Sequence, residues 1–102
     1  MKRQEIKELL KSDAFGSVVK VSGWVRTKRE SKNVNFINLN DGTVIHNLQI
    51  VADVTKFGEE LLKKVNTGAA LTVVGELVES GGQQRVELVA HEIVVVGEAD
   101  PD

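Results

Sequence analysis

The sequence predicts an all-β domain with minor α content, in which five strands close into a barrel. The chain has 102 residues, 41% of them hydrophobic, which suffices for one domain with a small core. Apolar and polar residues alternate over several short segments, which is the period of a strand. One segment between the predicted strands has apolar residues at helical spacing instead, and a second such segment precedes the first strand.

The predicted strands are bounded by turn residues. Gly23, in the middle of the first, indicates a sharp bend or bulge of the kind that lets one strand take part in both halves of a small barrel. Asn40-Asp41-Gly42 predicts a turn after the second strand, and Ser80-Gly81-Gly82-Gln83 predicts a turn before the last. The five strands are expected over residues 17–28, 34–40, 43–51, 70–79 and 85–96.

Two helices are expected. The first, over residues 2–11, has a narrow apolar stripe and is expected to pack on the outside of the main fold. The second, over residues 55–65, lies between the third and fourth strands, with Thr55 or Asp53 as its N-cap and Gly68 as its end. The apolar stripes are Ile6, Leu9 and Leu10 in the first helix, and Phe57, Leu61, Leu62 and Val65 in the second.

Composition excludes several classes of function. There is no cysteine, so there is neither a disulfide framework nor a thiolate metal site. No apolar run is long enough to span a membrane, and the N-terminus lacks the apolar stretch of a signal peptide, so a cytoplasmic protein without membrane contact is expected. The net charge is −2, yet residues 1–32 carry nine Lys or Arg against four Asp or Glu. Phosphate contacts depend on local charge, so this part of the chain can bind nucleic acid.

Three strands, a helix and two further strands are the element order of an OB-fold, a five-stranded Greek-key barrel. Ligands of this fold lie across the second and third strands, between the loop that joins the first two strands and the loop that joins the last two. In this chain those loops are expected at residues 29–33 and 80–84.

Phe36 lies on the outer face of the predicted second strand. Side chains alternate between the two faces, so Asn35, Ile37 and Leu39 share one face and Phe36 lies on the other, with Asn38. If Ile37 and Leu39 are in the core, Phe36 points outward, whereas a register shift of one residue would bury it. An outward aromatic beside amide and basic residues suits a nucleotide base on a phosphate backbone.

Other side chains near the second strand have two interpretations. Gln49 on the third strand and Glu87 on the fifth are expected on the outer face with Phe36; the alternative is that both are ordinary solvent-facing residues. Trp24 is expected to pack against a helix or the linker, with a second stacking platform as the alternative. His46 and His91 have no second imidazole or carboxylate at ligand spacing, so both are expected to be structural.

Basic residues follow the bend at Gly23. One register turns Arg26 and Lys28 toward the ligand, and the other turns Thr27 and Arg29 toward it, and the sequence leaves both open. The candidate RNA-binding residues are therefore Phe36, Gln49, Arg29, Glu87, Arg26, Lys28 and Lys32.

The runs GWVRTKRESKNVNFINLNDGT, NLQIV, TGAALTVVGELVES and VELVA resemble the N-terminal anticodon-binding domain of asparaginyl-tRNA synthetases. That family is grouped with the aspartyl and lysyl enzymes, which share this OB domain. The resemblance covers roughly residues 17–97. It implies a helical extension over residues 1–14, an OB-fold anticodon-binding domain over residues 15–97, and at residues 98–102 the start of a linker to a catalytic domain that the chain does not include.

The resemblance also implies roles for the candidate residues. In the resembling enzymes the aromatic that matches Phe36 stacks on the middle anticodon base, a uridine, and the residues that match Gln49 and Arg29 read that uridine by hydrogen bonds. The glutamate that matches Glu87 lies near the first anticodon bases; here it could accept from a guanine edge or hold Arg85 or Arg29. The remaining basic side chains are expected to hold the RNA backbone.

The implied function is recognition of the anticodon, in tRNA-Asn, by part of an asparagine–tRNA ligase. The resembling parents are homodimers that activate asparagine with ATP and Mg²⁺ in a separate catalytic domain. This chain has no nucleophile–base pair and no glycine-rich phosphate loop, so it is expected to bind RNA without catalysis and without a cofactor. The alternatives are the equivalent domain of an aspartyl- or lysyl-tRNA synthetase, a free-standing OB-fold protein for single-stranded nucleic acid, and an OB domain that binds protein.

Overall fold

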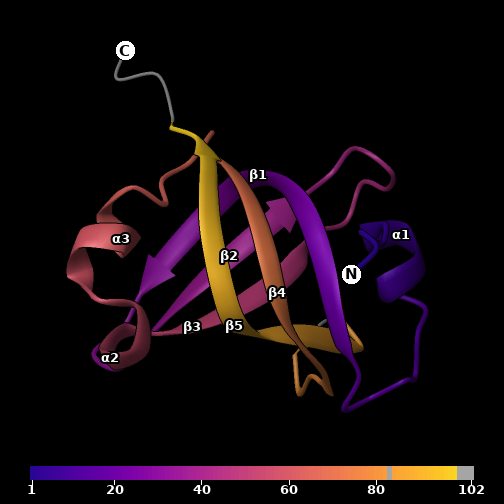
Figure 1. Ribbon diagram of the computed structural model, residues 1–102. Coiled ribbons are helices and arrows are strands. Elements are labelled where there is room, and N and C mark those ends of the chain that lie inside the picture. The colour runs from indigo at the N-terminus through magenta and orange to yellow at the C-terminus, as the bar shows by residue number, and fades with distance from the viewer. Residues whose placement is uncertain (83, 99–102) are drawn as a thin grey trace.

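The computed structural model describes residues 1–82 and 84–98 of the chain. Figure 1 shows a barrel of curved strands, with α1 at one side and α2 and α3 at the opposite side. The barrel is closed in the order β1–β2–β3–β5–β4; β3 and β5 are parallel, and the other pairs are antiparallel. This confirms the predicted all-β barrel with minor α content. Its strands are β1 (Val18–Glu30), β2 (Val34–Asn40), β3 (Leu48–Asp53), β4 (Ala70–Glu79) and β5 (Val86–Gly97).

Strand β1 takes part in both halves of the barrel because it changes partner along its length. Residues 18–24 pair with β4, and residues 24–30 pair with β2. Gly23 lies at the change, where a Cβ atom would be only 2.3 Å from the carbonyl oxygen of Asn40. A bulge follows at Arg26, where the register with β2 shifts. The bend predicted near Gly23 is confirmed, and the bulge itself lies at Arg26.

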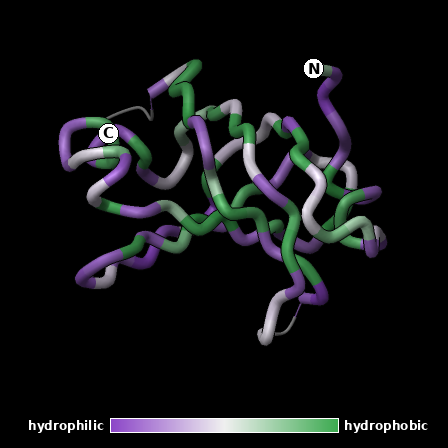
Figure 2. The backbone as a smooth tube through the Cα atoms, turned by 60° about the horizontal axis from the view of Figure 1, so that its bottom comes forward, coloured by the Kyte–Doolittle hydropathy of each residue, from purple (hydrophilic) through white to green (hydrophobic). Residues whose placement is uncertain are grey.

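Aliphatic side chains from all five strands fill the barrel. In Figure 2, hydrophobic and hydrophilic segments alternate along the chain. Inward and outward residues alternate along β2 and β4 as predicted. A slip of one residue would turn every inward side chain to solvent, so this pattern fixes the register. Buried members of the core include Val21, Val25, Ile37, Leu39, Leu48, Ile50, Leu71, Val73, Leu77, Val86 and Leu88.

Strand β3 begins at Leu48, later than the predicted residue 43, because the buried side chain of Asn40 organises the loop before it. The Asn40 Nδ2 donates to the carbonyl oxygens of Val44 at 3.1 Å and His46 at 3.2 Å, and to Asn47 Oδ1 at 3.0 Å. The Gly42 N–H in turn donates to Asn40 Oδ1 at 2.8 Å. The segment predicted to start the third strand is therefore a loop.

Helix α1 (Ile6–Leu9) is shorter than the predicted helix over residues 2–11, and it lies at one side of the barrel (Figure 1). Ile6 and Leu9 are fully buried in the same cluster as the barrel interior. The preceding residues are extended, and the Gln4 N–H donates to the carbonyl oxygen of Lys20 at 2.8 Å. The helix therefore lies outside the barrel as expected, and its two buried apolar side chains join the core.

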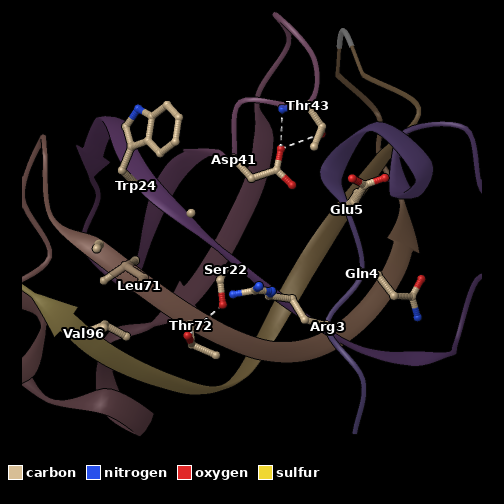
Figure 3. A pocket seen from close by; sticks show the side chains of 12 residues that line it. Arg3, Gln4, Glu5, Ser22, Trp24, Asp41, Thr43, Leu71, Thr72 and Val96 are labelled. Carbon is tan, nitrogen blue, oxygen red and sulfur yellow. Dashed lines mark hydrogen bonds between the residues drawn. The ribbon is translucent and has the colours of Figure 1, made fainter.

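The β2–β3 loop caps this helix from a distance. Asp41 Oδ2 accepts from the Ile6 N–H at 2.8 Å, and Thr43 Oγ1 accepts from the Lys7 N–H at 3.1 Å. Asp41 Oδ1 also accepts from the Thr43 N–H and hydroxyl, as the dashed lines in Figure 3 show. Burial raises the pKa of Asp41, but the bonds from Ile6 and Thr43 outweigh it, so this pKa lies below its ordinary value.

The predicted helix over residues 55–65 is divided in two, α2 (Val54–Phe57) and α3 (Glu59–Lys63). The break is at Gly58, whose φ of +81° favours glycine. Asp53, and not Thr55, is the N-cap, since its side chain accepts from the Thr55 N–H at 2.9 Å. Leu62 and Val65 are buried and join the core at this side of the barrel.

The turn between β4 and β5 is closed by Ser80. Its N–H donates to the carbonyl oxygen of Arg85 at 2.9 Å, and its Oγ accepts from the Gly82 N–H at 3.0 Å. Gln83 of the predicted turn lies outside the described residues, as do residues 99–102 of the predicted linker. None of the helices in the described part of the chain is long and apolar enough to cross a membrane.

Candidate nucleic-acid interface

The outer face of β1, β2, β3 and β5 carries two adjacent rows of side chains that run across the strands. Residues that pair across neighbouring strands share a face, so the register defines each row. The polar row is Thr27, Asn38, Gln49 and Glu87. The apolar row is Arg29, Phe36, Val51 and Val89. The rows are two residues apart on every strand and therefore form one continuous surface.

Phe36 is at the centre of the apolar row. Its neighbours Asn35 and Ile37 are buried in the barrel, whereas Phe36 is half-buried on the outer face, which confirms the predicted orientation. Val51 is half-buried beside it, and Val89 is 38% exposed, so apolar surface continues from Phe36 onto β3 and β5. A rigid aromatic face with apolar neighbours is the kind of surface on which a base stacks.

Arg29 covers Phe36. Its guanidinium carbon lies 4.4 Å from the centroid of the ring. The bulge at Arg26 produces this arrangement, because it brings Thr27 and Arg29 into register with the outward residues of β2. Of the two registers that the sequence left open, the structure shows the one that turns Arg29 to this face. Arg29 therefore combines a planar stacking group with hydrogen-bond donors at one end of the apolar row.

Gln49 and Glu87 are joined across the parallel pair of β3 and β5. Gln49 Nε2 donates to Glu87 Oε2 at 2.8 Å, and both side chains are half-buried. Glu87 was expected to meet a guanine edge, Arg85 or Arg29; its protein partner here is Gln49. Arg85 instead donates from Nη1 to the carbonyl oxygen of Lys11 at 3.2 Å.

The remaining members of the polar row were not among the predicted site residues. Asn38 Nδ2 donates to Thr27 Oγ1 at 2.8 Å. Asn38 and Gln49 also line a hollow of about 230 Å³ at the β4–β5 loop, together with Asn47, Ser80 and Gln84. The same alternation that placed Phe36 outward could have found Asn38, whereas Thr27 depends on a bulge that the sequence does not locate.

Lys28 is not part of this face. Its side chain is only 9% exposed and is directed toward the helices, where Nζ donates to the carbonyl oxygen of Leu62 at 2.6 Å. The same Nζ lies 3.3 Å from Glu30 Oε1. The structure thus places Lys28 at the end of α3, and not beside Phe36.

Arg26 and Lys32 are both exposed near the interface. Arg26 occupies the bulge of β1. Lys32 lies in the β1–β2 loop and lines a hollow of about 340 Å³ between that loop and α3, together with Lys63 and Glu59. Neither side chain belongs to the two rows.

A cavity larger than the two hollows above lies in the other half of the barrel. It has a volume of about 510 Å³ and contains none of the predicted site residues. Figure 3 shows Trp24 at its rim, and Ser22 and Thr72, whose hydroxyls are 2.8 Å apart, on its floor. Trp24 is 39% exposed and lies beside Gly42 of the β2–β3 loop, not against a helix. The linker, its other expected partner, lies largely outside the described residues.

The two histidines are not members of either row. His46 and His91 are both exposed, the first in the β2–β3 loop and the second on β5. Within residues 1–82 and 84–98, no three or more His, Cys, Asp or Glu side chains are grouped so that they could hold a metal ion.

A five-stranded barrel with this strand order and this outer face defines an OB-fold domain. The family model of the OB-fold nucleic acid binding domain matches residues 19–96. The chain belongs to that family.

Curated relatives match nearly all of the chain. An asparagine–tRNA ligase of Parabacteroides distasonis is 57% identical over 102 residues, which are 99% of this chain and 22% of that protein. An asparagine–tRNA ligase of Bacteroides fragilis is 52% identical over 99 residues, which are 96% of this chain and 21% of that protein. The chain therefore spans about a fifth of the length of these relatives.

Solved structures share the fold. The asparaginyl-tRNA synthetase of Pyrococcus horikoshii, complexed with asparaginyl-adenylate, superposes with a TM-score of 0.83 at 21% identity. The superposition covers 98% of this chain and 23% of that one. At this identity the likeness establishes the fold alone. The residues of the site are therefore assigned from the geometry of this chain.

Proposed function

We propose that this chain is the anticodon-binding domain of an asparagine–tRNA ligase, and that it stacks the central uridine of the anticodon on Phe36. Relatives of that name are 49–57% identical to it over almost its whole length. Its family is one of nucleic-acid-binding OB domains. Identity at this level to asparagine enzymes favours them over the aspartyl and lysyl alternatives.

The apolar row carries the proposal. Phe36 presents an aromatic ring on the outer face, extended by Val51 and Val89 and bordered by Arg29. Stacking of a base on an aromatic side chain contributes about 1–3 kcal/mol, which corresponds to about 5- to 150-fold in affinity. Every base has a π-face, so Phe36 supplies affinity with little preference among bases.

Preference requires contacts to the edge of the base, and the polar row provides them. Gln49 lies beside Phe36 on the same face and offers a donor and an acceptor to the uracil edge. Arg29 can donate to a uracil carbonyl or to a phosphate once a base takes its place on the ring. Arg26 and Lys32 are exposed and hold the phosphate backbone. Glu87 accepts a hydrogen bond from Gln49 and acts beside it.

The rest of the function belongs to the longer protein of which this domain is a part. Its relatives are about five times as long, so catalysis is assigned to the remaining polypeptide. There, asparagine is activated with ATP and Mg²⁺ and transferred to tRNA-Asn. We infer a cytoplasmic homodimer for that protein, with this domain supplying RNA binding and no cofactor site.

A salt-controlled titration with anticodon stem-loops tests the proposal. The 102-residue chain is compared with Phe36→Ala and Gln49→Ala on a loop with the anticodon GUU and on one with cytidine at its centre. We expect the wild type to prefer uridine, Phe36→Ala to weaken both loops about 5- to 150-fold, and Gln49→Ala to reduce the preference. Equal wild-type binding to both loops would favour a general single-strand binder, and no binding at low salt would exclude RNA as the ligand of the isolated domain.

A further inference from the structure

We infer that Glu87 is a positioning residue, which fixes the amide of Gln49 so that its carbonyl oxygen faces the bound base, and that Thr27 holds the amide of Asn38 in the same sense but less strictly. Amides fixed in this way select a base that carries an N–H on its Watson–Crick edge, which uracil has at N3 and cytosine lacks. The inference rests on the proposed function, and it assigns the choice of uridine to the whole polar row.

The orientation of Gln49 follows from the chemistry of its partner. A carboxylate oxygen only accepts hydrogen bonds, and in an amide only the nitrogen donates. The 2.8 Å contact between Gln49 and Glu87 therefore requires Nε2 to face Glu87 and Oε1 to face away from it. An amide next to a hydroxyl or to solvent could turn over, whereas this one cannot without losing its bond.

Asn38 is held in the same sense at the other end of the row. Its Nδ2 donates to Thr27 Oγ1 at 2.8 Å, on the side away from Gln49. A hydroxyl can donate as well as accept, so Thr27 holds its amide less strictly than Glu87 does. Asn38 and Gln49 are a cross-strand pair, and their nitrogens are directed to opposite ends of the row.

Space for a ligand edge lies in front of these two amides. Asn38 and Gln49 both line the hollow of about 230 Å³ at the β4–β5 loop. Phe36 itself does not line the hollow, but it lies two residues from Asn38 on the same face of β2. A base stacked on Phe36 can therefore bring its edge to Oε1 of Gln49 and Oδ1 of Asn38.

The fixed oxygens distinguish the two pyrimidines. The N3–H of uracil donates to a carbonyl oxygen, and the second N–H of Gln49 is free to donate to a uracil carbonyl. Cytosine presents a lone pair at N3, which a fixed carbonyl oxygen repels. Discrimination by such a paired contact is about 5- to 150-fold. If the amide of Gln49 could turn over, it would offer an N–H to cytosine and the preference would fall.

This role of Glu87 differs from direct contact with a base. A glutamate that reads the first anticodon base itself changes the preference at that base. A glutamate that acts through Gln49 changes the preference at the central base, and its effect disappears when Gln49 is absent. The two roles are therefore separable with the same set of RNA loops.

The test is a double-mutant cycle on the 102-residue chain, with dissociation constants measured at one salt concentration. The proteins are wild type, Glu87→Leu, Glu87→Gln, Gln49→Ala and Glu87→Leu/Gln49→Ala. Each is titrated with loops that carry uridine or cytidine at the centre, and with loops that carry guanosine or adenosine at the first position. Thr27→Val tests the less strict hold of Thr27 on the amide of Asn38. Glu92→Leu is the matched control, since Glu92 is exposed on the same strand but pairs with Val74 in the other half of the barrel.

The uridine-to-cytidine ratio is the affinity for the loop with central uridine divided by that for the loop with central cytidine. We expect Glu87→Leu to bring this ratio close to one, largely by better binding of the cytidine loop. Glu87→Gln places an amide that can donate as well as accept beside Gln49, so the amide of Gln49 can turn over and the ratio should fall, though by less than in Glu87→Leu. Thr27→Val should also reduce the ratio by less than Glu87→Leu. The double variant should match Gln49→Ala alone, and Glu92→Leu should match wild type.

An unchanged uridine-to-cytidine ratio in Glu87→Leu would overturn the inference, and would do so most clearly if the first-base preference changed instead. Equal losses of affinity for the loops with central uridine and with central cytidine would also overturn the inference. These outcomes leave the proposed function intact, because it requires only that the wild type prefers uridine. A wild type without that preference would remove the proposed function and this inference together.

Discussion

The guanidinium of Arg29 lies over the ring of Phe36, with 4.4 Å between its central carbon and the ring centroid. The cation therefore occupies a position that a stacked base would share or take over. A guanidinium stacked on an aromatic ring is held by about 0.5–1 kcal/mol at an exposed site, which a base that gains about 1–3 kcal/mol can displace. We expect a displaced Arg29 to contact the phosphates that flank the base.

We expect Arg29→Met to lower RNA affinity and to reduce the slope of log Kd against log salt concentration by about one. Arg29→Lys retains the charge, so its slope should stay close to that of wild type, while its affinity falls because a Lys ammonium is not planar. Titrations at several salt concentrations measure both quantities. An unchanged slope in Arg29→Met would show that Arg29 contacts no phosphate.

Lys28 and Lys32 should behave differently although they are close in sequence. Lys28 donates to Leu62 and is almost buried, so Lys28→Met should cost about 1–2 kcal/mol of unfolding free energy and leave the salt slope unchanged. Lys32 is exposed, so Lys32→Met should leave stability within about 0.5 kcal/mol and reduce the slope by about one. Urea unfolding and salt titrations of both variants check this. A reversed pattern would mean that Lys28 leaves α3 when RNA binds.

Two glycines allow the barrel strands to approach one another closely. A Cβ at Gly23 would lie 2.3 Å from Asn40 O, and one at Gly75 would lie 2.4 Å from Val89 O. Because both obstacles are backbone atoms of a paired strand, Gly23→Ala and Gly75→Ala should each cost about 1–3 kcal/mol or more. Gly81→Ala is the control, with nothing within 4 Å of its added Cβ. Denaturant unfolding curves should place Gly81→Ala within about 0.5 kcal/mol of wild type, and equal midpoints for all three variants would contradict the steric argument.

The parts of this fold that follow from local periodicity could be predicted from the sequence. The bounds of β2 and β4 match the predicted ranges, and the outward position of Phe36 follows from alternation along β2 alone. The start of β3 could not be predicted in this way, because it depends on Asn40, whose side chain holds residues 44–47 in a loop. The break at Gly58 was missed because the apolar pattern continues across it.

The site depends more than the fold on contacts between segments far apart in sequence. Gln49 and Glu87 were both predicted, yet their hydrogen bond requires β3 and β5 to be parallel neighbours, 38 residues apart along the chain. The place of Arg29 depends on a bulge at Arg26, which shifts every later side chain of β1 by one position. Lys28 looked like a ligand-facing cation for the same reason. Charge and residue type alone could not show which cations bind protein.

The contact of Asp41 with the first turn of α1 makes stability depend on pH. Its pKa is lowered from 3.8 because the bonds from Ile6 and Thr43 outweigh burial, so the folded state favours the ionised carboxylate. This contribution is present above pH 3.8, the pKa taken for the unfolded chain, and is lost as the pH falls through the lower folded pKa.

Asp41→Asn should therefore cost about 0.5–2 kcal/mol at pH 7, the usual cost of losing a cap, and much less near pH 2.5. Urea unfolding followed by the fluorescence of Trp24, the single tryptophan, measures the difference at both pH values. Asp13→Asn, at an exposed position, should match wild type at both, and a pH-independent difference for Asp41→Asn would show that its effect is steric.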